Sequence, residues 1–127
     1  MKNNMLLKGF YTIKEIVKVS EKEYNAFIHL NKDHEIFLGH FPGNPVVPGV
    51  CMVQVLKELT SEITAKKLIM NTSNNIKFMS LINPNTSPEI KLSITLNTDN
   101  EDIIKVKNIC YIEDKIALKM SVKYSIL

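Results

Sequence analysis

The sequence lacks arginine and tryptophan altogether, and lysine supplies all sixteen of its basic residues. Lysine is a point charge that cannot make the two parallel hydrogen bonds by which arginine recognises phosphate or guanine. The lysines are also scattered along the chain, and the formal net charge is only +3. This composition argues against a nucleic-acid-binding protein, while a mildly basic face for an acidic partner protein stays open beside an ordinary solvated surface.

Cysteine is scarce too, and Cys51 and Cys110 lie far apart in the chain. Neither belongs to a C-x-x-C pair or to a cluster with metal-ligand spacing, so we expect two reduced core residues, no bound metal and no cofactor.

Long apolar runs are missing as well. The N-terminal run is too short for a signal peptide, and no stretch approaches the ~18 apolar residues of a membrane span. We therefore expect a cytoplasmic protein with no membrane partner.

The remaining composition is that of a globular domain. The chain has 127 residues, of which 45% are hydrophobic and 23% are charged. This length can bury a core without disulfides or a metal, and no linker, repeat or low-complexity segment divides it. The sequence predicts a single domain over residues 1–127.

An apolar stretch after Gly49 has helical spacing. Its apolar residues recur every three or four positions, and charged residues gather toward its end. Pro48 and Gly49 suit a helix start, where proline loses nothing by lacking an N–H. We predict one helix over about residues 50–66, with these side chains mostly buried: Met52, Val53, Leu56, Leu59 and Ile63.

Segments on both sides of this helix alternate between apolar and polar residues, as half-buried strands do. Turn residues join two of them before the helix, and three after it, into hairpins. The segments are 11–20, 23–30, 74–82, 89–97, 103–112 and 116–126. They predict an α+β fold in which an antiparallel sheet of five or six strands has one apolar face, covered by the helix.

Glycine and proline concentrate around one histidine. Of the four glycines and five prolines in the chain, three of each fall between Gly39 and Gly49, in "GHFPGNPVVPG". The prolines stiffen this loop, and the glycines allow a close approach that a Cβ would obstruct. The pattern favours a rigid active-site loop around His40 over an ordinary surface loop. His29 and His34 have no such context and are expected to be ordinary strand and loop residues.

This motif, followed by an apolar helix, resembles the active-site segment of the β-hydroxyacyl-acyl carrier protein dehydratases of fatty-acid synthesis, a hot-dog fold family. The family pattern is approximately H-F-P-G-x-P-x-x-P-G-(V/C). The order of the other segments also agrees, with "IFLGHFPG" before the helix and "NNIKF" after it. The resemblance implies a hot-dog fold, in which an antiparallel β-sheet wraps a long central helix, and a subunit that works as part of a dimer.

The resemblance also assigns roles to residues. His40 would be the base that takes a proton from C2 of a 3-hydroxyacyl thioester. The backbone N–H of Gly49, helped by that of Val50, would hold the thioester carbonyl at the positive end of the helix. Phe41 and Pro48 of the same motif would contact the substrate. The implied reaction is the removal of water to give the 2-enoyl thioester.

One position departs from the family pattern. Fourteen residues after His40, where the family has a glutamate or aspartate as the acid, this chain has Gln54. An amide can hold a water or a hydroxyl but cannot deliver a proton as a carboxylic acid does, so we expect Gln54 to weaken the activity. Glu58 lies one turn further along the same helix face. It is either a carboxylate relocated by about 6 Å or a solvated helix residue.

Three functions stay open at this point. The first is a dehydratase acting on acyl carrier protein thioesters in fatty-acid or related lipid or polyketide synthesis, with His40, Gln54 and Glu58 at its site. The second is a noncatalytic or auxiliary hot-dog subunit that binds acyl carrier protein or pairs with a carboxylate-bearing dehydratase. The third is a hot-dog thioesterase. Because the family builds each site from two subunits, we expect a homodimer or higher oligomer, or a heterodimer with a related subunit.

Overall fold

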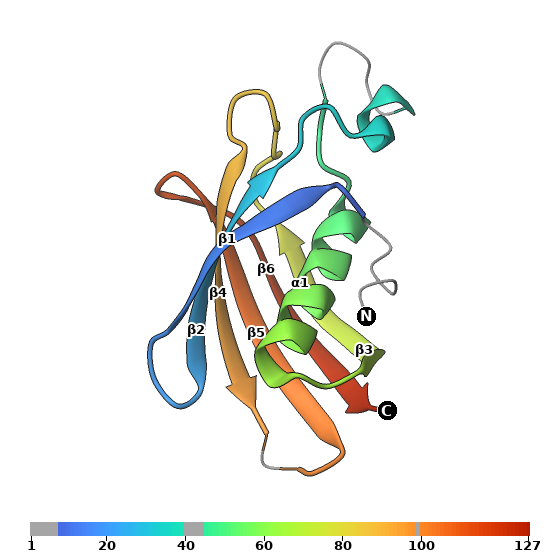
Figure 1. Ribbon diagram of the computed structural model, residues 1–127, viewed down its shortest axis with the longest axis vertical. Helices are drawn as coiled ribbons and strands as arrows, with labels where there is room; N and C mark the ends of the chain where they lie inside the picture. The colour runs from blue at the N-terminus through green and yellow to red at the C-terminus, as the bar shows by residue number, and fades with distance from the viewer. Residues whose placement is uncertain (1–7, 40–44, 99) are drawn as a thin grey trace.

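The computed structural model describes residues 8–39, 45–98 and 100–127. Two strands come first, then a short 3-10 helix and an α-helix, and four more strands follow (Figure 1). In chain order the elements of the described ranges are β1 (Tyr11–Lys18), β2 (Glu23–Leu30), η2 (Glu35–Gly39), α1 (Gly49–Thr64), β3 (Leu68–Phe78), β4 (Glu89–Asn97), β5 (Ile103–Ile112) and β6 (Lys115–Ile126).

The strands form one antiparallel sheet in the order β1-β2-β4-β5-β6-β3, so β1 and β3 are its edges. α1 runs along one face of this sheet, and the start of β1 lies close to α1 (Figure 1). The predicted hairpins β1-β2, β4-β5 and β5-β6 are all confirmed. A long helix wrapped by an antiparallel sheet is the hot-dog fold, as the motif implied.

The core lies between α1 and the apolar face of the sheet. Along β4, for example, Ile90, Leu92, Ile94 and Leu96 are buried and the residues between them are less so, which is the period of two that a half-buried strand requires. The helix contributes a continuous buried stripe, namely Cys51, Met52, Val55, Leu56, Leu59 and Thr60. Val53 and Ile63, predicted as mostly buried, are only partly buried, since Val53 lies beside this stripe and Ile63 lies in the last turn.

The helix ends earlier than predicted, and so the next strand starts earlier. α1 ends at Thr64, because Ala65 adopts the left-handed conformation (φ 58°) and its N–H donates to the carbonyl of Ser61 at 2.8 Å. β3 then begins at Leu68, not at residue 74. Its middle is polar and its pairing with β6 shifts register twice, so the apolar alternation that reveals a strand is broken there. Pairing with β6 determines this strand more than its own sequence does.

Both cysteines are free and buried, as predicted. Cys110 lies on the buried face of β5, where burial raises the pKa of its thiol to about 12 and its S–H donates to Asn108 Oδ1 at 3.2 Å. No helix in the described ranges is long and apolar enough to cross a membrane. The described residues also contain no group of three or more His, Cys, Asp or Glu side chains that could hold a metal ion.

The buried stripe of α1 gives a stability prediction. Leu59 is fully buried, so Leu59→Ala removes apolar contacts, leaves a cavity and should lower the free energy of unfolding by about 2–5 kcal/mol. Leu38 is 77% exposed, and Leu38→Ala, the control, should stay within about 0.5 kcal/mol of the parent. Urea denaturation at one protein concentration measures both. Equal losses in the two variants would contradict this packing.

Candidate active site

The site residues expected from the sequence fall into two groups. His40 and Phe41 lie outside the described residues. The other five belong to α1 or to the residue before it, and they are Pro48, Gly49, Val50, Gln54 and Glu58. The structure thus gives the geometry of the helix side of the site.

α1 begins without a side-chain cap. Pro48 is its N-cap residue, with extended backbone (φ −64°, ψ 140°), and its carbonyl accepts a hydrogen bond from the Cys51 N–H at 3.0 Å. The N–H groups of Gly49 and Val50 have no hydrogen-bond partner among the described residues, and the Val50 side chain is exposed. Two backbone donors are therefore available at the positive end of the helix dipole, a position that favours negative charge.

Phe78, at the end of β3, lies against Gly49. A Cβ built on Gly49 would sit 2.4 Å from Phe78 Cζ, far inside van der Waals contact. Gly49 does not have a positive φ, so its value here is the close approach that it permits and not a special backbone conformation. Phe78 is 57% exposed. Sequence reasoning did not foresee this contact between the helix start and β3.

A double-mutant cycle should detect the contact between Gly49 and Phe78. In a Phe78→Ala background the clash is absent, so Gly49→Ala should be neutral or stabilise the helix by up to about 1 kcal/mol. In the parent the same change has to displace the Phe78 ring. The effect of Gly49→Ala on the free energy of unfolding should therefore differ between the two backgrounds by about 0.5–3 kcal/mol. Additive effects in urea denaturation would show that the ring does not press on Gly49.

Gln54 and Glu58 lie on one face of α1 and contact each other. Gln54 Nε2 donates to Glu58 Oε2 at 3.0 Å, and both side chains are partly buried. The other carboxylate oxygen, Glu58 Oε1, accepts a hydrogen bond from the Tyr11 hydroxyl at 2.7 Å. Each oxygen of Glu58 thus has a protein donor, which favours a carboxylate held in place over a solvated one.

Tyr11 is the member of this group that sequence reasoning missed. It opens β1, is 8% exposed and lies edge-on to Phe10, with ring centroids 6.4 Å apart. Burial is the main cause that raises its pKa, followed by the hydrogen bond to Glu58 and by the charges of Glu58 and Glu62, so the phenol stays protonated and acts as a donor. No local signal joins Tyr11 to a residue 47 positions further along the chain.

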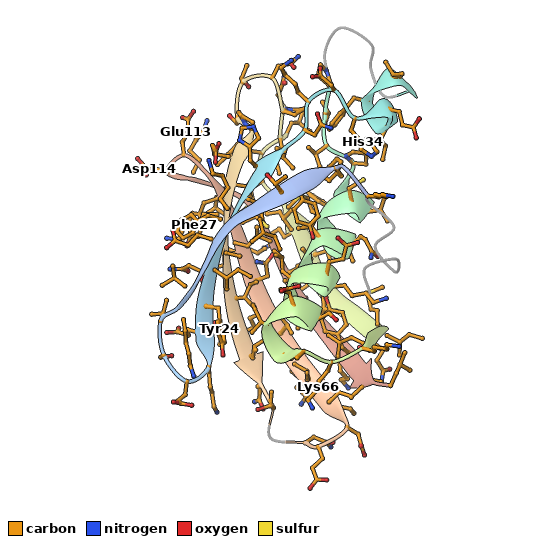
Figure 2. The ribbon with its side chains drawn as sticks, in the orientation of Figure 1. Tyr24, Phe27, His34, Lys66, Glu113 and Asp114 are labelled. Carbon is orange, nitrogen blue, oxygen red and sulfur yellow. The ribbon has the colours of Figure 1, made fainter. Side chains whose placement is uncertain are left out.

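The two other histidines have local structural contacts. His34 Nδ1 accepts a hydrogen bond from the Ile36 N–H at 3.0 Å, and its Nε2 lies 3.1 Å from the carbonyl of Lys8, so it links the 3-10 helix to the segment before β1 (Figure 2). His29 is on β2 and contacts Glu89 on the neighbouring strand through Nδ1. Neither belongs to the group around Gln54, in agreement with the expectation for both.

The sequence has relatives among known dehydratases. Residues 16–112 match the family described as "ApeI-like: ApeI dehydratase". A 3-hydroxyacyl-acyl-carrier-protein dehydratase FabZ from Lactobacillus helveticus is 30% identical over 123 residues, which cover 88% of this chain and 82% of the relative. The enzyme of the same name from Rickettsia rickettsii is 26% identical over 127 residues, covering 84% of this chain and 88% of the relative.

Solved structures share the fold at low sequence identity. A chain of the dehydratase heterocomplex ApeI:P from Xenorhabdus doucetiae superposes with a TM-score of 0.72 and 17% identity, covering 90% of this chain and 96% of that one. Thioesterase HI1161 from Haemophilus influenzae gives a TM-score of 0.67 and 15% identity, with coverages of 98% and 84%. At such identities the likeness establishes the fold alone, which dehydratase and thioesterase structures share.

Proposed function

Because the chain belongs to the ApeI-like dehydratase family, we propose that it removes water from 3-hydroxyacyl thioesters carried on acyl carrier protein. The product would be the 2-enoyl thioester, as an intermediate of fatty-acid or related lipid or polyketide synthesis. The observation that carries this proposal is the uncapped start of α1, directly after the histidine motif. The N–H groups of Gly49 and Val50, which have no partner among the residues that the structure describes, suit the thioester carbonyl, on which negative charge develops when C2 loses a proton.

In the proposed reaction a single group, His40, both takes up and returns the proton. His40 takes the proton from C2, the electrons of that bond form the C2–C3 double bond, and the C3–O bond breaks. The departing hydroxyl needs one proton to leave as water, and protonated His40 can return the one that it took. Gln54 would hold the hydroxyl by a hydrogen bond without supplying a proton. This scheme accounts for a working but slower dehydratase.

Glu58 suits a supporting role better than that of a relocated acid. A general acid has to carry a proton and point it at the leaving group. Both oxygens of Glu58 already accept hydrogen bonds, from Tyr11 and Gln54, so neither faces a substrate unopposed. We propose that Glu58 keeps Gln54 in place.

The edge strand β3 supports the proposed dimer. It ends the sheet and carries exposed apolar side chains, as does the segment just after it, and these are Ile69, Met70, Phe78, Met79 and Leu81. An uncovered apolar edge is a template for pairing with another chain. A second copy joined at β3 would bury these side chains and continue the sheet. The family resemblance implies that in such a dimer each site combines the histidine of one subunit with residue 54 of the other.

A mixed dimer is the second candidate, and Gln54 is the observation that favours it. A subunit with the histidine but no carboxylate could form one complete site with a related subunit that supplies a glutamate or aspartate. It would be inactive alone and would bind acyl carrier protein or its partner dehydratase. A thioesterase is the third candidate, supported only by the shared fold.

One assay separates these candidates. The purified protein is incubated with short and long 3-hydroxyacyl chains, attached to acyl carrier protein or to coenzyme A, and the products are identified by mass. Loss of one water from the carrier-bound chain supports the proposal, and release of the free acid supports the thioesterase. Recovery of unchanged substrate, with turnover only after a carboxylate-bearing homologue is co-expressed, supports the mixed dimer.

A further inference from the structure

We infer that Tyr11 is a positioning residue which, through Glu58, fixes the Gln54 amide so that its carbonyl oxygen is the atom offered to a ligand. The identity of that ligand rests on the proposed function. The positioning does not, because Tyr11, Glu58 and Gln54 bond to one another within one subunit. A primary amide can rotate and present either a donor or an acceptor. Its neighbours decide which end faces outward.

Glu58 decides the orientation of Gln54. The carboxylate oxygens are acceptors, so the Gln54 atom that lies 3.0 Å from Glu58 Oε2 has to be the amide nitrogen. A rotated amide would place two oxygens against each other and lose this bond. The Gln54 carbonyl oxygen accepts no hydrogen bond from the described residues. The free end of the side chain is therefore an acceptor.

Tyr11 keeps Glu58 in this arrangement. Its hydroxyl donates to Oε1 at 2.7 Å from a ring that is 8% exposed and fixed edge-on against Phe10. β1 holds the phenol in place through its ladder with β2, where Tyr11 lies opposite Leu30. A donor on each oxygen leaves the carboxylate little freedom to rotate, because any other rotamer gives up one of the two bonds. The orientation of Gln54 thus depends on a side chain from a different element.

An acceptor at Gln54 selects the chemical group at C3 of the substrate. A 3-hydroxyl can donate a hydrogen bond to it, and so can the water formed by dehydration. A 3-oxo group has only acceptors and would face the Gln54 oxygen without a hydrogen bond. The chain should therefore prefer 3-hydroxyacyl over 3-oxoacyl chains. One such hydrogen bond corresponds to roughly a tenfold difference in affinity.

Binding of uncleavable analogues tests this preference. The probes are 3-hydroxyacyl and 3-oxoacyl pantetheine amides of one chain length, in which an amide replaces the thioester. The parent should bind the hydroxyl compound about tenfold more tightly, and Tyr11→Phe should bring the ratio close to one. Tyr24→Phe is the matched control, because Tyr24 lies on β2 toward the other end of the sheet from the start of α1 (Figure 2) and its hydroxyl has no partner among the described residues. The Tyr24→Phe variant should keep the parent's ratio of affinities for the two compounds.

The NMR signal of the Gln54 side-chain amide reports the positioning without any ligand. It is assigned by its loss in Gln54→Leu, and it should shift and exchange faster in Tyr11→Phe but not in Tyr24→Phe. If Tyr11→Phe leaves both this signal and the binding ratio unchanged, Tyr11 does not position Gln54 and the inference is overturned. If the signal moves while the parent shows no preference for the hydroxyl analogue, positioning stands and the proposed substrate is wrong.

Discussion

Replacing Gln54 with glutamate should raise the rate of dehydration by about 10²–10⁴-fold, the usual contribution of a positioned general acid. The scheme proposed above gives His40 two tasks, removing the C2 proton and returning it to the departing hydroxyl. A carboxylic acid at position 54 would take over the second task. The measurement is the initial rate of water loss from a carrier-bound 3-hydroxyacyl chain, with parent and variant at equal concentration.

Glu58, one helix turn from position 54, should help the new glutamate to act as an acid. In the variant, two carboxylates would lie one helix turn apart, and their repulsion favours the protonated form of one of them. A proton held there is what a general acid needs near neutral pH. The variant should also lose the donor that Gln54 gave to Glu58. Gln54→Leu is the control: it removes the amide without adding an acid, and a rise in rate for that variant would show that a proton donor is not the missing group.

His40→Ala should remove the activity of both the parent and Gln54→Glu, a loss of about 10²–10⁴-fold or more. The expected loss is large because no other group in the scheme can take the C2 proton. His34→Ala is the matched control, since His34 bonds the Ile36 N–H and is near the carbonyl of Lys8 but has no part in the chemistry. Activity that survives His40→Ala in a folded protein would exclude His40 as the base.

Co-expression extends the His40 prediction to the mixed dimer. If the chain is half of a heterodimer, the parent alone should be inactive and should gain activity with a carboxylate-bearing homologue. His40→Ala should then remove that gain, because the complete site uses the histidine of this subunit. A heterodimer that stays fully active after this substitution would place the working site entirely on the partner. In that case this chain has a structural or carrier-binding role.

The fold was predictable because its signals are local. Alternation along β4 and β6 and the spacing of apolar residues in α1 are direct consequences of one buried face on each element. The predicted start of β3 was wrong because its register shifts and its polar middle remove that alternation. The end of α1 depends on the left-handed residue Ala65, which a sequence signals poorly when it is not glycine.

Only the part of the site that lies in the histidine motif and the helix after it could be predicted. The spacing from His40 identified Gln54 and Glu58, and helical periodicity placed them on one face. Tyr11 and Phe78 could not be found in this way, since their contacts with Glu58 and Gly49 exist only after the sheet has formed around the helix. The sequence therefore left two roles open for Glu58, and it could not reveal the hydrogen bond from Tyr11 that favours the supporting role.

Hydration of a 2-enoyl chain in heavy water is the sharpest test of whether this protein is a dehydratase. The reaction is reversible, so a dehydratase offered the enoyl thioester of acyl carrier protein should form the 3-hydroxyacyl thioester with one deuterium at C2. We expect this labelled product, with the thioester intact, for the parent and at a higher rate for Gln54→Glu, and no label for His40→Ala. Unlabelled enoyl chain recovered from both the parent and Gln54→Glu, or free acid released by hydrolysis of the thioester, would exclude a dehydratase.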